Sequence, residues 1–404
     1  MLDLKAIREN PGPARAALAR RGADGLLDET LALDARRREL LPELEQIRAA
    51  KNAASKRIGD LQRAGDDASN AIAEVKGVGE REKQLESELR DAEERLRAAQ
   101  AGLPNPPDPD APDEDTVLRE VGEGGAEGPD HLELLGDLVD LEAGARVAGS
   151  RFVYLKGPLV LLELALVRWA IEALEGHGFT PVVPPVLVRE EALFGTGMLP
   201  DTEQQLYSLP EDELYLAGTS EVPLASLHAG EIVDDEQLPL RYAGFSPCFR
   251  REAGAAGKDT RGMFRVHQFD KVEMFAFVRP EESAEEHERL LAIEEELWQA
   301  LDVPYRVVNI AVDELGASAA KKYDIEAWLP GQGRYREVTS CSNTTDFQAR
   351  RLNVRFRGPA GVAPVHTLNG TAVAISRAII AIAENHGGEV PEVLQRFGAP
   401  PRLV

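Results

Sequence analysis

The chain has 404 residues, a formal net charge of −24 and two cysteines, Cys248 and Cys341. This length predicts two or more domains with a buried core, and the negative charge argues against a generally basic nucleic-acid binder. Two cysteines without metal-ligand spacing argue against a zinc site and against more than one disulfide. The N-terminal segment MLDLKAIREN has no signal-like apolar run, and charges interrupt the longest apolar stretch, Leu159 to Ala173. We therefore expect a cytoplasmic protein without a membrane span.

Residues 1–103 are predicted to form an antiparallel helical hairpin. Two seams of residues spaced alternately four and three apart are joined by a turn at residues 64–69, which is typical of a coiled coil. The first seam has one polar member, Lys51, and the second has Glu82. The seams comprise Leu40, Leu44, Ile47, Lys51, Ala54, Ile58 and Leu61, followed by Ala71, Val75, Val78, Glu82, Leu85, Leu89, Ala92, Leu96, Ala99 and Leu103.

The tip of this hairpin is locally basic, with Asp60 as the single acidic residue among residues 48–63. The basic residues there are Arg48, Lys51, Lys56, Arg57 and Arg63. A coiled coil is commonly a dimerisation element, whereas a basic stripe on a stiff arm suits a phosphate backbone. The residues alone leave both interpretations open.

Residues 104–128 are rich in Pro, Asp and Gly, with Arg119 as their single basic residue, and predict an acidic linker. The body of the protein is expected from residue 129. Residues 158–176 have helical periodicity, and residues 179–188, with Pro181, Pro184 and Pro185, indicate an extended edge segment.

Residues 245–277 indicate a strand, a glycine-rich polar loop and a return strand. Alternation places Arg250 and Glu252 on one face of the first strand. On the return strand, one face carries Arg265, His267, Phe269, Lys271 and Glu273, and the other carries Val266, Val272 and Met274. This pattern fits a site for an anionic, ring-bearing ligand or a salt-bridged surface hairpin.

Three further segments carry polar residues whose role is open on pattern alone. In AGTSEVPL, Thr219 and Glu221 share a face if the segment is a strand, but the same residues could cap a helix. In YREVTSCSN, strict alternation puts Glu337 and Ser340 on opposite sides of a strand. In the apolar helix after HTLNGT, the lone cation Arg377 needs an anionic partner, either a carboxylate or a phosphate. Neither a P-loop nor a Rossmann glycine motif is present.

The segment FRREAGAAGKDTRGMFRVHQFDKVEMF resembles the second signature motif of class II aminoacyl-tRNA synthetases, in the form found in seryl-tRNA synthetases. Residues 158–176 and 179–188 together resemble the first motif, with Pro185 as its proline, and residues 366–386 resemble the third. FGTGMLP and DFQARRL also resemble this family, although Ala372 and Ser376 stand where many relatives carry glycine.

The resemblance implies an α+β protein: a helical hairpin as a tRNA-binding arm (residues 1–103), a linker (104–128) and a class II catalytic domain (129–404) built on an antiparallel sheet flanked by helices. It implies activation of L-serine by ATP to seryl-adenylate, then transfer to tRNA(Ser) and also tRNA(Sec). A homodimer with tRNA bound across the two subunits is implied as well.

The resemblance also implies the site residues. The catalytic residues would be Arg250, Glu252 and Arg377. ATP would be bound by Arg250, Arg251, Glu252, Val266, Phe269, Glu337, Val338, Thr339, Ser340 and Arg377. Serine would be bound by Thr219, Ser220, Glu221, Arg250, Glu273 and Thr371. The tRNA would be bound by Arg48, Lys51, Lys56, Arg57 and Arg63, and Mg²⁺ by Glu337 and Ser340.

Within these sets the resemblance implies distinct roles. Arg250 would bridge the serine carboxylate and the α-phosphate, and Glu252 would accept from the adenine amino group. Phe269 and Arg377 would sandwich adenine, which Val266 would contact through its main chain. A shared magnesium site for Glu337 and Ser340 requires a bulge in their strand. Glu273 and Thr371 would hold the serine hydroxyl, with Thr219 and Glu221 near the amino group.

Three rival interpretations follow. The chain could be a paralogue that serves antibiotic biosynthesis or resistance, or it could activate serine for an acceptor other than tRNA. The long arm favours tRNA over a carrier-protein acceptor. A coiled-coil or RNA-binding protein with an inactive catalytic domain would tolerate loss of Arg250, Glu252, Glu273 or Arg377, and all four are present.

Overall fold

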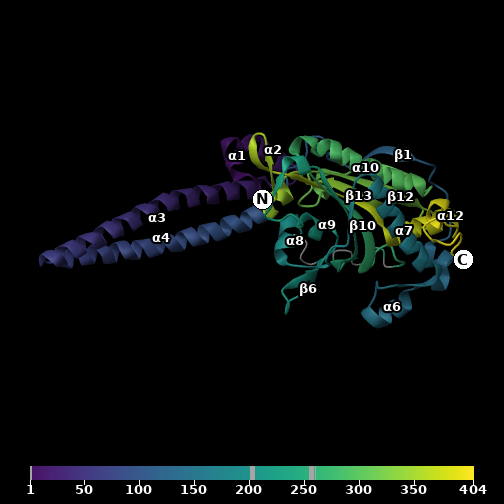
Figure 1. Ribbon diagram of the computed structural model, residues 1–404, viewed down its shortest axis with the longest axis horizontal. Coiled ribbons are helices and arrows are strands. Elements are labelled where there is room, and N and C mark those ends of the chain that lie inside the picture. The colour runs from purple at the N-terminus through teal and green to yellow at the C-terminus, as the bar shows by residue number, and fades with distance from the viewer. Residues whose placement is uncertain (1, 201–204, 254–258, 260) are drawn as a thin grey trace. The chain divides into compact units, whose positions relative to one another are not determined.

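The computed structural model describes residues 2–200, 205–253, 259 and 261–404. The chain divides into two compact units, residues 1–103 and 104–404 (Figure 1).

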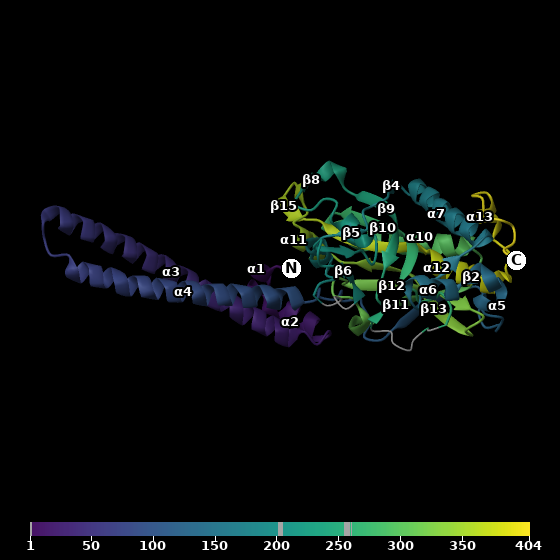
Figure 2. The same ribbon diagram turned by 90° about the horizontal axis from the view of Figure 1, so that it is seen from below.

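The first unit is the predicted helical hairpin. Helices α1 (Leu4–Glu9) and α2 (Pro11–Ala19) precede the long helices α3 (Asp24–Ala64) and α4 (Ser69–Gly102), which run side by side in Figures 1 and 2. Helix α3 ends at Ala64 and is capped by Gly65, whose left-handed backbone (φ 78°) suits glycine. The seam buries Leu40 and Leu44 of α3 against Leu85 and Ala92 of α4, which confirms the spacing-based prediction.

The polar members of the two seams meet in the structure. The Lys51 ammonium pairs with the Glu82 carboxylate across the hairpin. Arg48 lies one turn earlier and contacts both Glu82, at 3.5 Å, and Glu86, at 2.8 Å. Lys51 and Arg48 therefore contribute charge pairs between α3 and α4.

The second unit is built on an eight-stranded sheet with the order β1-β11-β12-β13-β16-β10-β9-β4. All neighbouring strands are antiparallel except β4 and β9, which are parallel. In chain order the strands are β1 (Thr116–Val121), β4 (Thr180–Val182), β9 (Leu240–Phe249), β10 (Gln268–Val278), β11 (Tyr305–Asn309), β12 (Lys321–Leu329), β13 (Arg334–Asn343) and β16 (His366–Ala374).

Strand β1 lies inside residues 104–128, where the composition suggested a linker. It pairs with β11 at the edge of the sheet, and its side chains are largely exposed. The strand itself (TVLREV) contains strand-favouring residues, but it is short and lies in a Pro-, Asp- and Gly-rich segment, so the composition of the segment hides it.

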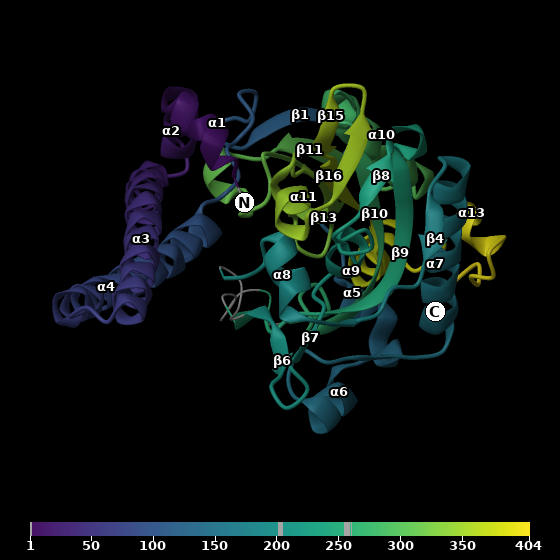
Figure 3. The ribbon, with the colours of Figure 1, turned by 60° about the vertical axis from the view of Figure 1, so that its left-hand side comes forward.

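Three helices cover one face of the sheet, namely α7 (Pro158–Gly176), α10 (Ser283–Ala300) and α12 (Ile375–His386). Figure 3 shows α7 beside β4 and β9. Val272 and Met274 of β10 point into this core. Lys271 and Glu273 alternate with them along the strand and therefore point to the opposite face. That opposite face carries the cavity described below.

Shorter elements complete the unit. They are α5 (His131–Leu135), α6 (Leu141–Ala148), α8 (Glu190–Thr196), α9 (Glu221–Ala225), α11 (Phe347–Leu352), α13 (Glu392–Gln395), β2 (Val139–Asp140), β3 (Tyr154–Leu155), β5 (Leu187–Val188), β6 (Tyr207–Leu209), β7 (Leu214–Leu216), β8 (Ile232–Asp234), β14 (Arg355–Gly358) and β15 (Gly361–Pro364). No helix in the described part of the chain combines the length and apolar character needed to cross a bilayer.

Candidate active site

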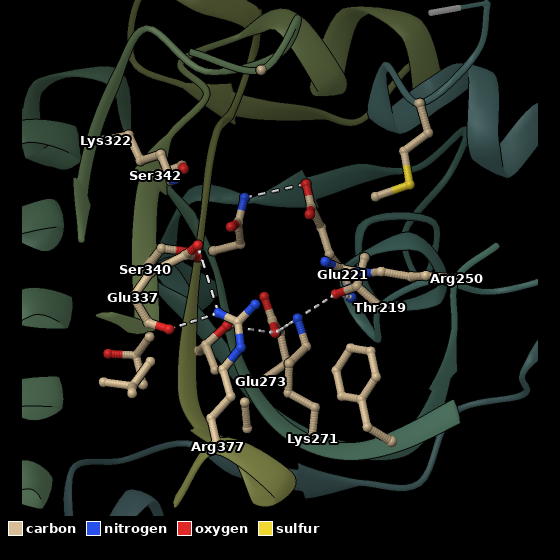
Figure 4. A pocket seen from close by; sticks show the side chains of 18 of the residues that line it. Thr219, Glu221, Arg250, Lys271, Glu273, Lys322, Glu337, Ser340, Ser342 and Arg377 are labelled. Atoms are coloured by element: carbon tan, nitrogen blue, oxygen red, sulfur yellow. Dashed lines mark hydrogen bonds and ion pairs between the residues drawn. The ribbon is translucent and has the colours of Figure 1, made fainter. Parts of the chain in front are cut away.

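A cavity of about 340 Å³ lies over the middle of the sheet (Figure 4). Its floor comes from β10, β13 and β16, and its walls include the segment that follows β9 and the start of α12. Almost all the residues predicted for ATP and serine line it: Thr219, Glu221, Arg250, Glu252, Val266, Phe269, Glu337, Val338, Thr339, Ser340, Thr371, Glu273 and Arg377.

A bulge brings Glu337 and Ser340 into the same cavity. In the pairing of β12 with β13, Glu326 faces Glu337 and Ile325 faces Thr339, so Val338 is the extra residue. The expected break in alternation is thereby confirmed. A second bulge, at Ala372 on β16, lies between the pairs Val272–Val373 and Glu273–Thr371.

Arg377 lies at the wall formed by the start of α12. Its guanidinium donates to the Glu337 main-chain oxygen at 2.9 Å and lies 3.5 Å from the Glu337 carboxylate. Burial raises the pKa of Glu337, but Arg377, Lys322, Arg250 and Arg265 outweigh it and lower that pKa to about 2. The carboxylate is therefore ionised at neutral pH.

One aromatic ring between two guanidinium groups marks this end of the cavity. The Phe264 ring centroid lies 4.7 Å from the Arg377 Cζ atom and 3.9 Å from the Arg336 Cζ atom. Phe269 instead lies near Arg250, with the Arg250 Cζ atom 5.4 Å from its ring centroid. The aromatic ring stacked near Arg377 is thus Phe264, whereas the predicted sandwich of adenine would use Phe269 as the partner of Arg377.

Glu252 and Arg250 follow strand β9 rather than lying in it. Arg250 donates from Nε to the Gly218 main-chain oxygen at 3.1 Å, which fixes the base of the side chain. Glu252 has a positive φ of 52° and forms an ion pair with Arg265 at 2.6 Å. Glu252 therefore already has a cationic partner in the cavity wall.

The opposite end of the cavity holds two carboxyl groups, the buried Glu273 and the partly buried Glu221. Glu221 accepts hydrogen bonds at Oε1 from the amides of Gln348, at 2.7 Å, and Asn369, at 3.2 Å. Glu273 forms an ion pair with Lys271 and accepts a long hydrogen bond, 3.5 Å, from the Thr371 hydroxyl. Burial, followed by the charge of Glu273, raises the pKa of Glu221 to about 7.

Thr219 and Glu221 both line the cavity, but they do so from the start of a helix and not from one face of a strand. Glu221 begins the short helix α9, and its main-chain N–H donates to the Thr219 hydroxyl at 3.2 Å. The helix-start interpretation is therefore the correct local structure, and the strand interpretation is wrong.

Two residues predicted for ATP or serine do not line the cavity. The Ser220 side chain is fully buried and shares a 2.8 Å hydrogen bond with Ser246. Arg251 is exposed, and its main-chain N–H donates to the Gln205 main-chain oxygen at 2.8 Å. In the glycine-rich loop, Gly254, Gly257 and Lys258 lie outside the described residues.

Several lining or supporting residues had no predicted role, namely Phe264, Lys271, Gln348 and Asn369. Lys271 could have been found, because it shares a strand face with Phe269 and Glu273. Gln348 and Asn369 lie 127 and 148 positions from Glu221, so their convergence depends on the fold.

The five cations predicted for tRNA differ in their contacts within the hairpin. Arg48 and Lys51 pair with α4, and Arg63 pairs with Asp60 at 2.6 Å. Lys56 and Arg57 are exposed, and within the described residues neither has an ion pair. These two side chains are therefore exposed and not engaged in an ion pair of the hairpin, so they are available to an external anion.

The antiparallel sheet and its polar cavity are those of a class II aminoacyl-tRNA synthetase. Residues 206–386 match the family model of the tRNA synthetase class II core domain (G, H, P, S and T). Residues 1–107 match the model of the seryl-tRNA synthetase N-terminal domain. The chain therefore belongs to the seryl-tRNA synthetase family.

Individual relatives agree with this assignment. The serine–tRNA ligase of Streptomyces coelicolor is 47% identical over 422 residues, which cover 98% of this chain and 97% of that protein. The crystal structure of seryl-tRNA synthetase from Pyrococcus horikoshii complexed with ATP has a TM-score of 0.90 and 42% identity, covering 100% of this chain and 99% of that chain. The Naegleria fowleri enzyme in complex with AMP has a TM-score of 0.86 and 33% identity, covering 100% and 98%.

Proposed function

We propose that this protein activates L-serine with ATP to seryl-adenylate and transfers the serine to tRNA(Ser). The observation that carries the proposal is one cavity with two chemically distinct ends. Aromatic rings and guanidinium groups lie at one end and the carboxyl groups of Glu221 and Glu273 at the other, in a member of the seryl-tRNA synthetase family. Transfer to tRNA(Sec) would use the same site.

In the first step, the serine carboxylate attacks the α-phosphate of ATP and pyrophosphate leaves. Arg250 lines the cavity and interacts electrostatically with Glu337 as well as with Glu221 and Glu273, so its planar guanidinium is suited to hold both reacting groups. Such positioning and charge stabilisation supply most of the rate enhancement in this kind of displacement. Phe269, Arg377 and the Val266 main chain are proposed to hold adenine, with Glu252 accepting from its amino group.

Mg²⁺ fits the donor groups at the ATP end. Glu337 is ionised, Ser340 offers a hydroxyl, and the bulge at Val338 places both on the cavity side. Mg²⁺ prefers a few such oxygen ligands supplemented by phosphate oxygens and water. When bound, the ion would neutralise charge on the phosphates.

At the other end, serine would be recognised through its ammonium and hydroxyl groups. Glu221 faces the cavity as the partner for the ammonium, and Glu273 with Thr371 would bind the hydroxyl. A site built to hydrogen-bond a hydroxyl disfavours alanine, since buried polar groups then lack partners.

The transfer step is proposed to use the arm and a second subunit in the cytoplasm. Lys56 and Arg57 on α3 are suited to bind a phosphate backbone. An exposed apolar surface supports a homodimer with tRNA across both subunits: Val160, Leu161 and Leu164 on α7 are 42%, 50% and 59% exposed, and Val183 is 80% exposed.

ATP–pyrophosphate exchange with each amino acid, followed by charging of purified tRNA(Ser), tests the proposal. We expect exchange with serine alone and charging of tRNA(Ser). Arg250→Ala should abolish the exchange, because it removes the group that aligns both substrates. Exchange without tRNA charging would favour another acceptor or a specialised paralogue, and near-normal exchange in Arg250→Ala would refute the role of Arg250.

A further inference from the structure

Lys271 lines the carboxyl-bearing end of the cavity, although the family resemblance implied no role for it. It lies on β10 between Phe269 and Glu273 on the same strand face, and the residue is 5% exposed. Its ammonium forms an ion pair with the Glu273 carboxylate. The same ammonium donates to the Thr219 hydroxyl oxygen at 2.8 Å. One cation thus links the two sides of the proposed serine pocket (Figure 4).

The charges in this part of the cavity balance only when Lys271 is counted. Glu221 and Glu273 supply two carboxyl groups, and Arg250 and Lys271 supply two cations. Serine adds one ammonium and one carboxylate. If Arg250 takes the serine carboxylate and Glu221 takes the ammonium, Glu273 keeps Lys271 as its counter-ion. Without Lys271, one carboxyl group would lack a cation in a water-poor site.

We propose that Lys271 is a positioning residue for serine selection, which holds the Glu273 carboxylate and the Thr219 hydroxyl in their working orientations. This inference rests on the proposed serine activation. Lys271 keeps Glu273 available as an acceptor for the serine hydroxyl, whereas a protonated Glu273 would offer one acceptor fewer. The geometry therefore makes Lys271 a determinant of hydroxyl recognition that acts through Glu273.

The contact with Lys271 also orients the Thr219 hydroxyl. Its hydroxyl oxygen accepts from the Lys271 ammonium at 2.8 Å and from the Glu221 main-chain N–H at 3.2 Å. Both acceptor positions of that oxygen are then filled, so the Thr219 hydroxyl can only donate to a substrate. Binding of the serine ammonium falls to Glu221.

The electrostatic surroundings of Glu273 agree with this role. Burial raises the pKa of Glu273, and Lys271 is the strongest influence that lowers it, followed by Arg250. Glu221 and Glu294 are the other carboxyl groups that interact with Glu273, and the buried Cys248 thiol is also within its field. Removal of Lys271 therefore leaves Glu273 facing two carboxyl groups with Arg250 as the remaining cation.

The test measures serine-dependent ATP–pyrophosphate exchange between pH 6 and 9 for wild type, Lys271→Met, Glu273→Gln and the double variant. For Lys271→Met we expect the serine KM at pH 7 to rise roughly tenfold or more, with the ATP KM changed far less. The acid limb of kcat/KM for serine should shift to higher pH. In the Glu273→Gln background, loss of Lys271 should raise the serine KM much less than it does in the wild type, because the two residues act as one unit.

Two further variants separate charge from folding. Lys271→Gln keeps a donor for Thr219 but no charge, so it should shift the acid limb as Lys271→Met does. Lys322→Met removes another lysine of the same cavity, one that is 22% exposed and pairs with Asp324 at 2.8 Å, and should not shift the serine acid limb. Thermal unfolding identifies any variant that is not folded. If Lys271→Met is not folded, the same measurements on Lys271→Gln replace it.

Additive losses in the double variant, or equal rises in the serine and ATP KM with an unmoved acid limb, would overturn the role of Lys271. A wild-type protein that shows no serine-dependent exchange would instead contradict the proposed function. The two failures are thus distinguishable.

Discussion

At the scale of single residues, Glu221 couples substrate binding to pH. Its pKa is raised to about 7 by burial and by the charge of Glu273, so a large fraction is protonated near neutral pH in the empty cavity. A protonated carboxyl cannot pair with the serine ammonium. We expect the serine KM to rise about tenfold between pH 8 and pH 6, because the ionised fraction falls about tenfold. Exchange assays at saturating ATP measure this, and a flat serine KM over this range would contradict it.

Glu294 should influence stability rather than catalysis. This residue of α10 is fully buried, and its Oε1 atom has no hydrogen-bond partner within the described residues. Burial, with Asp324 and Glu273, raises its pKa well above the ordinary value of 4.5. The folded state therefore keeps a proton that the unfolded chain releases, so this carboxyl increasingly destabilises the fold as the pH rises above that value.

Glu294→Gln should consequently raise the melting temperature at pH 8 by several degrees, and far less at pH 5. Glu285→Gln, at an exposed position of the same helix, should change the melting temperature little at either pH. Thermal unfolding of both variants at the two pH values checks this. An equal effect of Glu294→Gln at pH 5 and pH 8 would contradict the assigned protonation.

At the scale of elements, the hairpin residues divide into those that pair the helices and those that face solvent. Replacing Lys56 and Arg57 with alanine should raise the tRNA KM in charging assays and leave serine-dependent exchange unchanged. The salt dependence of tRNA binding should weaken by roughly one in log–log slope for each phosphate group that the variant no longer binds. Arg97→Ala, an exposed cation on α4, is the matched control. An unchanged tRNA KM in the double variant would refute this assignment.

How far these elements follow from the sequence depends on where their stabilising contacts come from. The seams of α3 and α4 are visible because apolar residues recur at helical spacing, and β10 because alternate residues face core and cavity. Strand β1 escaped detection because it is six residues long, largely exposed and surrounded by Pro, Asp and Gly, so neither burial nor composition marks it. The bulge at Val338 could be expected only through the family resemblance, since nothing in the local pattern marks it.

The residues of the site also divide into those that sequence motifs reveal and those that only the fold brings together. Arg250, Glu273 and Arg377 lie in motifs that can be matched along the chain, and the cavity unites them. Gln348 and Asn369 support Glu221 from α11 and β16, a contact created by folding alone. Phe264 lies in the segment before β10, where strict alternation no longer applies, so its position between two guanidinium groups could not be predicted.

At the scale of the whole molecule, the exposed apolar surface on α7 predicts an assembly. Leu164 is 59% exposed and neighbours the exposed Val160 and Leu161. Leu164→Glu would place an unpaired charge in a proposed subunit interface and should convert the dimer to monomers. Sedimentation measures this, and Leu227→Glu, at a leucine 47% exposed elsewhere, should leave the dimer intact. A wild type that sediments as a monomer would contradict the proposed homodimer.

The ion pair between Lys51 and Glu82 also restricts the alignment of α3 along α4 in the arm. If α3 slid along α4 by one heptad, each charge would face an aliphatic side chain, so one alignment of the two helices is favoured over its neighbours. The arm then keeps a constant reach from its base to the turn at residues 64–69.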